Sequence, residues 1–344
     1  MTAVLDGHND SLLRLHRAGG GIESFVEGGD DEAHLDVPRA RRGGFGGGLF
    51  AVFVPGESTS EPPADAKSYS LSLAPPVDPD AAGEAADAIA GGLFWLEAAG
   101  ALRVVRGGGE LAACLEDETL AGVLHFEGAE AISGVDDLER RYEQGLRSLG
   151  LVWSRPNAYG EGVPFQFPGS PDTGPGLTPS GRDLVRACNR LGVLVDLSHL
   201  NLRGFFDVAA ASDAPLAASH SNAHALCASS RNLTDDQLDA IGDTGGIVGI
   251  NFAVQFVRED GRLEASTPID VVVDHIDYIA DRIGIEHVGF GSDFDGAKIP
   301  DAIGDAAGLP ALLAALRVRG YDDRAVTRIA HGNWLRLLRR TWAS

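Results

Sequence analysis

The chain has 344 residues, of which 44% are hydrophobic and 23% charged, a balance that is typical of a folded globular protein and excludes global disorder. Its 50 aspartates and glutamates outnumber its 28 lysines and arginines, and the net charge of −22 argues against nonspecific binding to nucleic acid or to an anionic membrane. No apolar run reaches the roughly 20 residues that a membrane-spanning helix needs, and no signal-peptide pattern opens the sequence, so we expect a cytoplasmic protein.

The first predicted element is a β-strand within residues 2–8, and seven more apolar runs of strand-like length follow it: residues 47–55, 120–128, 148–153, 192–199, 215–221, 245–252 and 287–296. Helix-like segments lie between the later runs, at residues 180–191, 202–212, 233–244 and 267–284. Strands that alternate with helices indicate a parallel sheet. Eight runs favour an α/β fold of the (β/α)8, TIM-like barrel type over residues 1–344 as a single domain, with a doubly wound open sheet as the alternative.

Two long insertions interrupt this alternation. Residues 55–83 are rich in Pro, Ser and Asp, and residues 155–181 are rich in Pro and Gly. Both follow predicted strands, which is where a (β/α)8 barrel carries its active-site loops. We therefore expect both insertions to be long active-site loops.

Polar residues of metal-ligating type end several of the predicted strands. They are His8 and Asp10, Glu127, His199, His220 and Asp293. Residues two apart on a strand share a face, and the carboxyl ends of all strands in a parallel barrel open onto one mouth. Imidazole nitrogens and carboxylate oxygens suit a zinc-type divalent ion, and two ions could share one carboxylate and activate a water molecule between them.

The remaining histidines and the cysteines have simpler explanations. We expect the other seven histidines to be hydrogen-bonded structural residues or solvated loop residues: His16, His34, His125, His224, His275, His287 and His331. The three cysteines, Cys114, Cys188 and Cys227, are far apart and show no C-x-x-C spacing, so we expect reduced, buried thiols.

Several distinctive strings resemble the membrane (renal) dipeptidase family of zinc dipeptidases, and in particular its soluble bacterial members. They are DGHND at 6–10, GGFGGGLFAVFVP at 43–55, HFEGAEAI at 125–132, HVGFGSDFDG at 287–296 and HGNWLRLL at 331–338. The block from residue 177 to 252 is the most specific, because it contains several such strings in the family's order. The similarity covers nearly the whole chain.

The resemblance implies a (β/α)8 metallohydrolase barrel with a binuclear zinc site. One zinc ion is implied at His8, Asp10 and Glu127. Glu127 is implied to bridge to a second zinc ion, which His199 and His220 would hold. The implied reaction is hydrolysis of a small dipeptide, with a D-residue allowed at its C-terminal position, and a homodimer is left open.

The resemblance also implies roles for two residues outside the ligand set. Arg231 is implied to bind the dipeptide carboxylate, which its planar fork of donors matches; a surface salt bridge is the alternative role. Asp293 is implied to move the proton of the bridging water. We expect Asp295 to be structural, because its side chain should point away from that of Asp293 or into the following turn.

One position departs from the family pattern. Trp153 stands where many members have a histidine that helps to stabilise the developing oxyanion. Indole has one N–H donor and no titratable proton, so Trp153 indicates a weaker donor, a neighbour that takes over, lower turnover or a different substrate pocket.

Two other functions remain open at this point. A related binuclear amidohydrolase could cut another small amide or an N-acyl amino acid, because fold alone does not decide the substrate. No strand-end lysine that could be carboxylated into a metal bridge is evident, which opposes that reading. A noncatalytic metal-dependent binding protein is the second alternative, with Trp153 as its only support.

Overall fold

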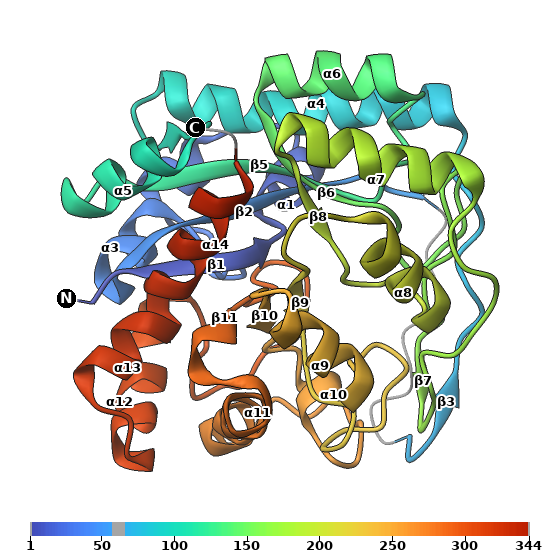
Figure 1. Cartoon of the computed structure of the whole chain (residues 1–344). Coiled ribbons are helices and arrows are strands. Elements are labelled where there is room, and N and C mark those ends of the chain that lie inside the picture. Colours follow the sequence, from blue (N-terminus) through green and yellow to red (C-terminus); the bar gives the residue numbers. More distant parts are fainter. Residues whose placement is uncertain (1, 57–65, 343–344) are drawn as a thin grey trace.

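A closed barrel of parallel strands forms the centre of the computed structural model, which describes residues 2–56 and 66–342 (Figure 1). Its eight strands are β1 Val4–Asn9, β2 Phe45–Phe53, β5 Ala121–Glu127, β6 Leu146–Gly150, β8 Leu194–Asp196, β9 Ala217–Ser221, β10 Ile247–Ile250 and β11 Val288–Phe290. They neighbour one another in the order β2-β1-β11-β10-β9-β8-β6-β5, and β2 also pairs with β5. This last pairing closes the barrel.

Each of the eight apolar runs in the sequence supplies one barrel strand. The barrel prediction is therefore confirmed, and the open doubly wound sheet is excluded because its edge strands would remain unpaired. A short additional strand, β4 (Arg103–Val104), pairs in parallel with the beginning of β5.

Helices surround the barrel. They are α1 Ser11–Arg17, α2 Glu23–Glu27, α3 Val37–Gly43, α4 Pro79–Ala98, α5 Gly108–Glu116, α6 Val135–Gln144, α7 Pro179–Leu191, α8 Leu202–Ala211, α9 Asp235–Asp243, α10 Val254–Val257, α11 Ile269–Ile283, α12 Leu309–Arg319, α13 Asp323–Thr327 and α14 Asn333–Thr341. The four helix-like segments of the sequence correspond to α7, α8, α9 and α11.

Local sequence explains where several of these helices begin and end. The side chain of Thr178 accepts a hydrogen bond from the Gly181 amide at the start of α7, and Pro179 occupies the first turn. Gly192 ends the same helix in the left-handed conformation that favours glycine. Thr234 and Gln237 form a capping box at the start of α9.

Helix α14 closes the amino-terminal end of the barrel. Trp334 is buried and donates a hydrogen bond from its indole nitrogen to the Phe290 carbonyl at 2.9 Å. A Cβ atom at Gly7 or Gly289 would lie only 2.5 or 2.6 Å from the Trp334 ring, so the ring fits only because these strand positions are glycine. With this end filled, the opposite end of the barrel is left for a site.

The two predicted insertions pair with each other. A short strand in each, β3 (Tyr69–Ser70) and β7 (Gln166–Phe167), forms a two-stranded antiparallel sheet. The first insertion ends where α4 begins at Pro79 and the second where α7 begins at Pro179, and residues 57–65 of the first lie outside the described residues.

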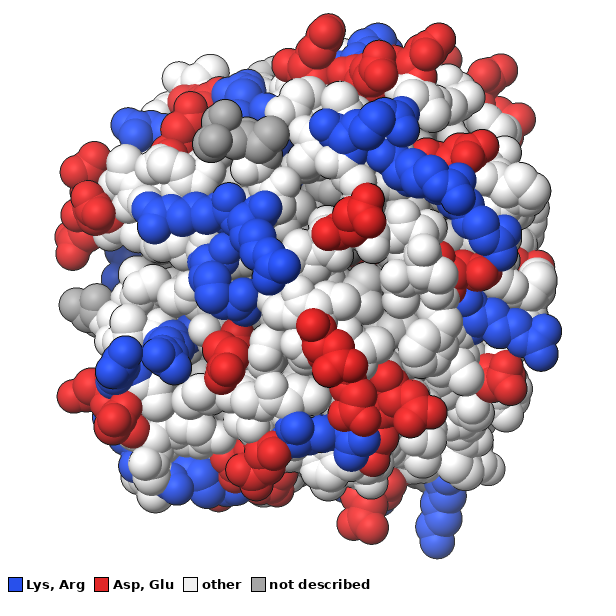
Figure 2. Space-filling model, viewed as in Figure 1, with Lys and Arg blue, Asp and Glu red and all other residues white. Residues whose placement is uncertain are grey.

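Charged side chains on the outside of the molecule are largely interspersed. Arg282 pairs with Asp235 and Asp239, and Arg319 pairs with Asp274 at 2.7 Å. Figure 2 shows acidic side chains close to most of the basic ones on the face that it presents. Across residues 2–56 and 66–342, no helix combines the length and apolar character needed to span a bilayer.

Candidate metal centre

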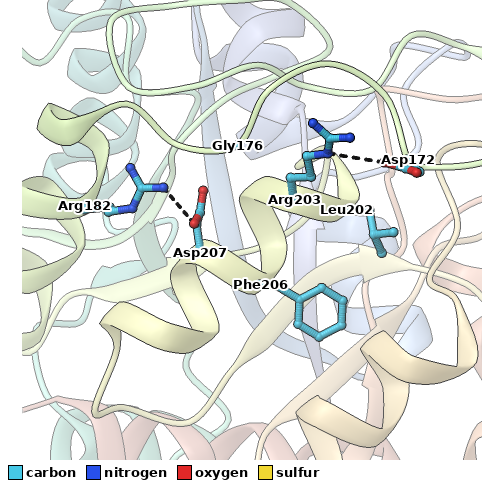
Figure 3. Close-up of a pocket in the computed structure, with 7 residues that line it drawn as sticks. All are labelled: Asp172, Gly176, Arg182, Leu202, Arg203, Phe206 and Asp207. Atoms are coloured by element: carbon cyan, nitrogen blue, oxygen red, sulfur yellow. Dashed lines mark ion pairs between the residues drawn. The ribbon is translucent and has the colours of Figure 1, made fainter.

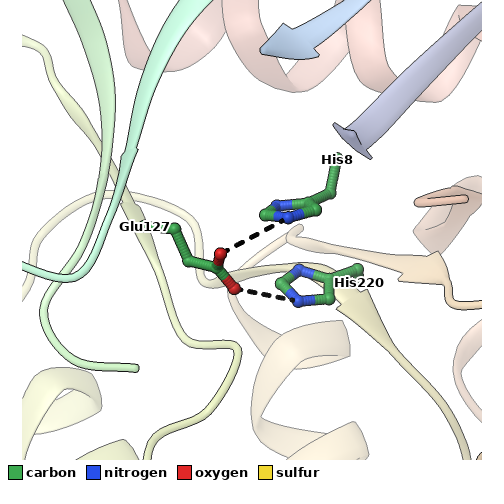
Figure 4. Close-up of side chains that lie close together, drawn as sticks. All are labelled: His8, Glu127 and His220. Atoms are coloured by element: carbon green, nitrogen blue, oxygen red, sulfur yellow. Dashed lines mark ion pairs between the residues drawn. The ribbon is translucent and has the colours of Figure 1, made fainter. Parts of the chain in front are cut away.

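Three side chains from distant strands converge at the carboxyl end of the barrel (Figure 4). Glu127 is the last residue of β5, His8 lies near the end of β1, and His220 lies within β9. His8 Nε2 is 3.7 Å from Glu127 Oε2, and His220 Nε2 is 3.6 Å from Glu127 Oε1. The His8 and His220 rings stack with centroids 3.8 Å apart. These three groups therefore meet at one mouth of the barrel, as their places near the ends of strands predict.

The other predicted ligands lie beside this trio. His199 Nε2 is 3.0 Å from Glu127 Oε1 and 3.1 Å from His220 Nε2. Asp10 Oδ2 is 3.4 Å from His8 Nε2. His8, Asp10 and Asp293 also present ligand atoms within 4.8 Å of one another. The structure therefore brings together all six residues that the sequence singled out.

Two of these residues lie beyond the strands that we predicted to end with them. Strand β8 ends at Asp196 and β11 at Phe290, so His199 and Asp293 each follow three residues later, in loops. Their φ angles are 68° and 62°, in the left-handed region that residues other than glycine rarely adopt. Backbone strain of this kind concentrates at functional sites, where the surrounding structure holds it in place.

Serine hydroxyls orient the two neighbouring imidazoles. Ser154 Oγ is 2.9 Å from His199 Nδ1, and Ser219 Oγ is 2.7 Å from His220 Nδ1. Ser219 also donates its hydroxyl proton to Asp196 Oδ2 at 2.5 Å. Because that proton is committed, Ser219 accepts from His220 Nδ1–H, and the Nε2 lone pair of His220 points toward Glu127.

The four central groups of the cluster differ in ionisation. Burial, reinforced by Asp10 and Asp293, raises the pKa of Glu127 to about 8. Burial opposes a charge on His8, but the nearby carboxylates, Glu127 foremost, outweigh burial and raise its pKa to about 10. Burial lowers the pKa values of His199 and His220 well below the usual range, which keeps both imidazoles neutral. His199 and His220 are thus already neutral ligands, whereas a divalent cation would displace the protons that His8 and Glu127 hold at neutral pH.

Unsatisfied polar atoms provide a second test of whether this cluster fits metal ions. Both ring nitrogens of His8 are buried and have no hydrogen-bond partner among the described residues. Such orphaned groups are costly unless something else binds them. Together with the short distance between His199 Nε2 and His220 Nε2, this makes the donor set fit one or two divalent ions.

Arg231 lies against the same cluster. Its Nη1 donates to Ser221 Oγ at 3.0 Å and its Nη2 to the His220 carbonyl at 2.9 Å. Its Nε has no hydrogen-bond partner in the part of the chain that the structure describes. Burial lowers the pKa of Arg231 to about 10, against the opposing effect of Asp293. Arg231 is thus a buried cation with donor capacity to spare, unlike a surface salt bridge.

Asp293 and Asp295 have different surroundings. Asp293 Oδ2 accepts a hydrogen bond from Asn251 Nδ2 at 2.9 Å, and burial raises the pKa of Asp293 above its usual value. Asp295 instead accepts from Ser11 Oγ at 2.6 Å and from the His34 amide at 2.7 Å. These contacts agree with the structural role that we predicted for Asp295.

A cavity of about 530 Å³ opens beside the cluster. Its lining includes Glu127, His199, His220, Arg231 and Asp293. The paired insertions contribute Tyr69, Leu71 and Phe165, and the loop after β6 contributes Trp153. The cavity is large enough for a small ligand.

A second hollow, of about 630 Å³, lies on the outer surface along α8 (Figure 3). Its two acidic groups already pair with arginines, Arg182 with Asp207 at 2.7 Å and Arg203 with Asp172 at 3.6 Å. The candidate ligands line the other cavity, so we place the site there.

Most of the histidines that we set aside are hydrogen-bonded to the backbone, as expected: His224, His275, His287 and His331 each have a backbone carbonyl partner. His125 is closer to the centre, because its Nδ1 is 2.9 Å from Ser148 Oγ and its ring centroid is 5.5 Å from that of His8. His34 lines the cavity. The three cysteines are free and buried, as predicted.

The sequence analysis missed the residues that orient the site, namely Ser154, Ser219, Asp196 and Asn251. Asn251 had a usable signal, since it follows an apolar run in the same way as the ligands do. Asp196 had one as well, as an acidic residue inside an apolar run. The two serines had none, because serine is common at strand ends for many reasons.

Comparison with known proteins identifies the family. Residues 1–343 match the sequence profile of membrane dipeptidases, peptidase family M19. The chain belongs to this family. A crystal structure of a metallopeptidase from Rhodobacter sphaeroides, liganded with a phosphinate mimic of the dipeptide L-Ala-D-Ala, is 50% identical, with a TM-score of 0.94 and 99% of each chain covered.

Two relatives in other organisms are also similar. An uncharacterized protein from the pqqA 5′ region of Klebsiella pneumoniae is 49% identical over 245 residues, which cover 71% of this chain and 90% of the relative. Dipeptidase tcpJ of Claviceps purpurea is 34% identical over 221 residues, which cover 64% of this chain and 50% of the relative. The predicted enzyme class, a metallo-dipeptidase, is confirmed by the family, and a metal cofactor belongs to it.

Proposed function

We propose that this enzyme hydrolyses small dipeptides with two divalent metal ions, zinc in the first place, which share the carboxylate of Glu127. The observation that carries the proposal is the convergence of three imidazole Nε2 atoms on that carboxylate, at 3.0, 3.6 and 3.7 Å. His8 and Asp10 would complete one site with Glu127, and His199 and His220 would complete the other. When bound, such a metal pair polarises the scissile carbonyl and makes a water molecule acidic enough to act as a nucleophile near neutral pH.

Arg231 would recognise the free carboxylate of the dipeptide. The unpartnered Nε and the fork of the guanidinium offer donors for a carboxylate, and the residue lines the cavity next to the ligands. A buried guanidinium this close to the reaction centre would limit the enzyme to short peptides, because the free carboxylate must lie within a residue of the scissile bond.

Asp293 would move protons during the reaction. Its carboxylate lies near His8 and Asp10, and Asn251 fixes its orientation. It would accept a proton from the attacking water and later deliver that proton to the leaving amine.

We extend the proposal to the stereochemistry of the substrate. The Rhodobacter sphaeroides structure carries a mimic of L-Ala-D-Ala, so we include dipeptides with a D-residue at the C-terminal position among the substrates. The insertions at 55–83 and 155–181 would shape this preference, because Tyr69, Leu71 and Phe165 line the cavity. The other amides that amidohydrolases cut have less support, since the amidohydrolase from Pseudomonas aeruginosa is 20% identical and shows the fold alone.

Removal of the metal tests the proposed function directly. Protein treated with a chelator and then dialysed should hydrolyse neither L-Ala-L-Ala nor L-Ala-D-Ala, and addition of Zn²⁺ should restore hydrolysis, measured as release of free alanine. Failure of the zinc-loaded protein to cut any dipeptide of either stereochemistry would contradict the proposal and would leave a metal-dependent binding protein as the explanation.

Arg231→Lys tests carboxylate recognition. Lysine keeps the charge but loses the fork, so we expect kcat/KM for the free dipeptide to fall by roughly 10- to 100-fold, mainly through KM. Arg203→Lys, on the outer surface of α8, is the matched control and should change neither constant. If wild-type enzyme hydrolysed a C-terminally amidated dipeptide as fast as the free acid, the role assigned to Arg231 would be wrong.

A further inference from the structure

Four aromatic side chains form a continuous wall of the active-site cavity: Phe53, Trp153, Phe165 and Phe256. Phe53 is the last residue of β2, Trp153 follows β6, Phe165 lies in the second insertion, and Phe256 lies in α10. Consecutive ring centroids are 5.0, 5.7 and 6.0 Å apart, all within the range of direct aromatic contact. Residues from four separate elements therefore build one apolar surface, which we call the aromatic wall.

The aromatic wall adjoins the metal centre. The Trp153 ring centroid is 5.8 Å from that of His199, and the Phe165 centroid is 6.3 Å from it. A substrate whose scissile bond lies at the metal centre therefore has part of its structure close to the aromatic wall.

The wall is only partly covered by the protein itself. Phe53, Trp153 and Phe165 are half-buried, and all three line the cavity. Apolar rings in such a place gain burial when a ligand covers them. Polar and charged groups such as Arg14, Glu32 and Lys298 line other parts of the same cavity. The wall is thus a distinct apolar region within a mixed pocket.

Two of the four rings, Phe53 and Trp153, lie against a buried arginine that is itself fixed. The Arg155 guanidinium lies 5.0 Å from the Phe53 centroid and 5.5 Å from the Trp153 centroid. Arg155 is itself fixed by hydrogen bonds to Glu130 at 2.7 Å and to the Val54 carbonyl at 2.6 Å. A surface fixed in this way is preorganised for a ligand, because it loses little freedom when the ligand binds.

We propose that the aromatic wall is a specificity subsite for a bulky apolar or aromatic side chain of the dipeptide, with Trp153 as the residue that sets the preference. This inference rests on the proposed function. A dipeptide held by its carboxylate at Arg231 and by its scissile bond at the metal centre has only two side chains left to contact the cavity. The side chain that faces the wall replaces water on three apolar rings, so the substrates that it favours are larger and less polar than alanyl-alanine.

Two substrate series test this inference. In one series the N-terminal residue changes from Ala to Leu to Phe with C-terminal Ala constant, and in the other the C-terminal residue changes, in L and D forms. We expect kcat/KM of the wild type to rise by about tenfold or more from Ala to Leu or Phe in one of the series. In Trp153→Ala and Trp153→His, the ratio of the bulky to the small substrate should fall by about tenfold.

The control and the second variant keep the test decisive. Trp95→Ala removes a tryptophan that is 54% exposed on α4, and it should leave the ratio of the two kcat/KM values unchanged. Phe165→Leu removes a ring from another part of the wall and should lower the ratio even if a Trp153 variant fails to fold. A wild type that cuts alanyl-alanine with no preference for bulky side chains, or variants with the wild-type ratio, would overturn the subsite but not the proposed function. Absence of all dipeptide hydrolysis would overturn both.

Discussion

Asp293→Asn is expected to keep its metal content while kcat falls by roughly two to four powers of ten. Asparagine preserves the size of the side chain and can still accept the hydrogen bond from Asn251, which is 2.9 Å from Asp293 Oδ2. It removes the carboxylate that takes up a proton and returns it to the leaving amine. Steady-state kinetics and metal analysis on the same preparation measure both quantities.

The geometry also allows a competing role for Asp293, that of a metal ligand, and the same experiment distinguishes the two roles. Asp293 lies close enough to His8 and Asp10 for the three to hold one ion. If Asp293 is mainly a metal ligand, Asp293→Asn should lose metal in parallel with kcat. A variant with full metal and near-wild-type kcat would remove Asp293 from the mechanism. Asp301→Asn, at an exposed position in the same loop region, controls for loss of one charge and should match the wild type.

The fold was predictable because two kinds of signal agree along the chain. Eight apolar runs gave the eight strands, and polar, amphipathic stretches between them gave α7, α8, α9 and α11. Closure of the barrel was harder to predict from the sequence. It depends on β2 pairing with both β1 and β5, and these strands are far apart in sequence. The pairing of β3 with β7 was not predictable from either insertion alone, because each strand has only two residues.

The candidate ligands were predictable for a topological reason. In a parallel barrel every strand points the same way, so a polar residue at the end of any strand reaches the same mouth. Glu127 and His220 lie at or near the ends of their strands, as this reasoning predicts. His199 and Asp293 instead lie three residues past their strands. An apolar loop residue such as Leu197 looks like strand in sequence, although β8 has already ended at Asp196.

The hydrogen bonds that orient the two imidazoles could not be predicted from the sequence. Ser154 and Ser219 act because their hydroxyls lie 2.9 and 2.7 Å from the imidazoles of His199 and His220. Ser154 and His199 lie in loops that follow β6 and β8, and Ser219 and His220 are neighbours on β9. Both distances therefore depend on the local course of the backbone and on side-chain rotamers, which the sequence pattern does not specify. The aromatic wall could not be predicted either, since its four rings come from four elements.

The second large effect is expected for Glu127. In Glu127→Gln the affinity for both metal ions should fall by roughly a hundredfold or more, because one neutral amide oxygen cannot replace a carboxylate that offers an oxygen to each site. Glu127 Oε1 faces His199 and His220, while Oε2 faces His8. Competition with a chelator of known affinity measures the loss, and activity at saturating metal should also be much reduced.

Glu130→Gln is the stringent control for this substitution. Glu130 is as buried as Glu127 and lies three residues further along the chain, but its carboxylate contacts Arg155 rather than the histidines. Both variants replace one buried carboxyl group with an amide, so a general effect of that change on folding would appear in both, and thermal unfolding reports the stability of each. Loss of metal in Glu127→Gln alone assigns the effect to direct ligation. Loss of only one of the two ions would show that Glu127 serves a single site, and full retention of both would contradict bridging.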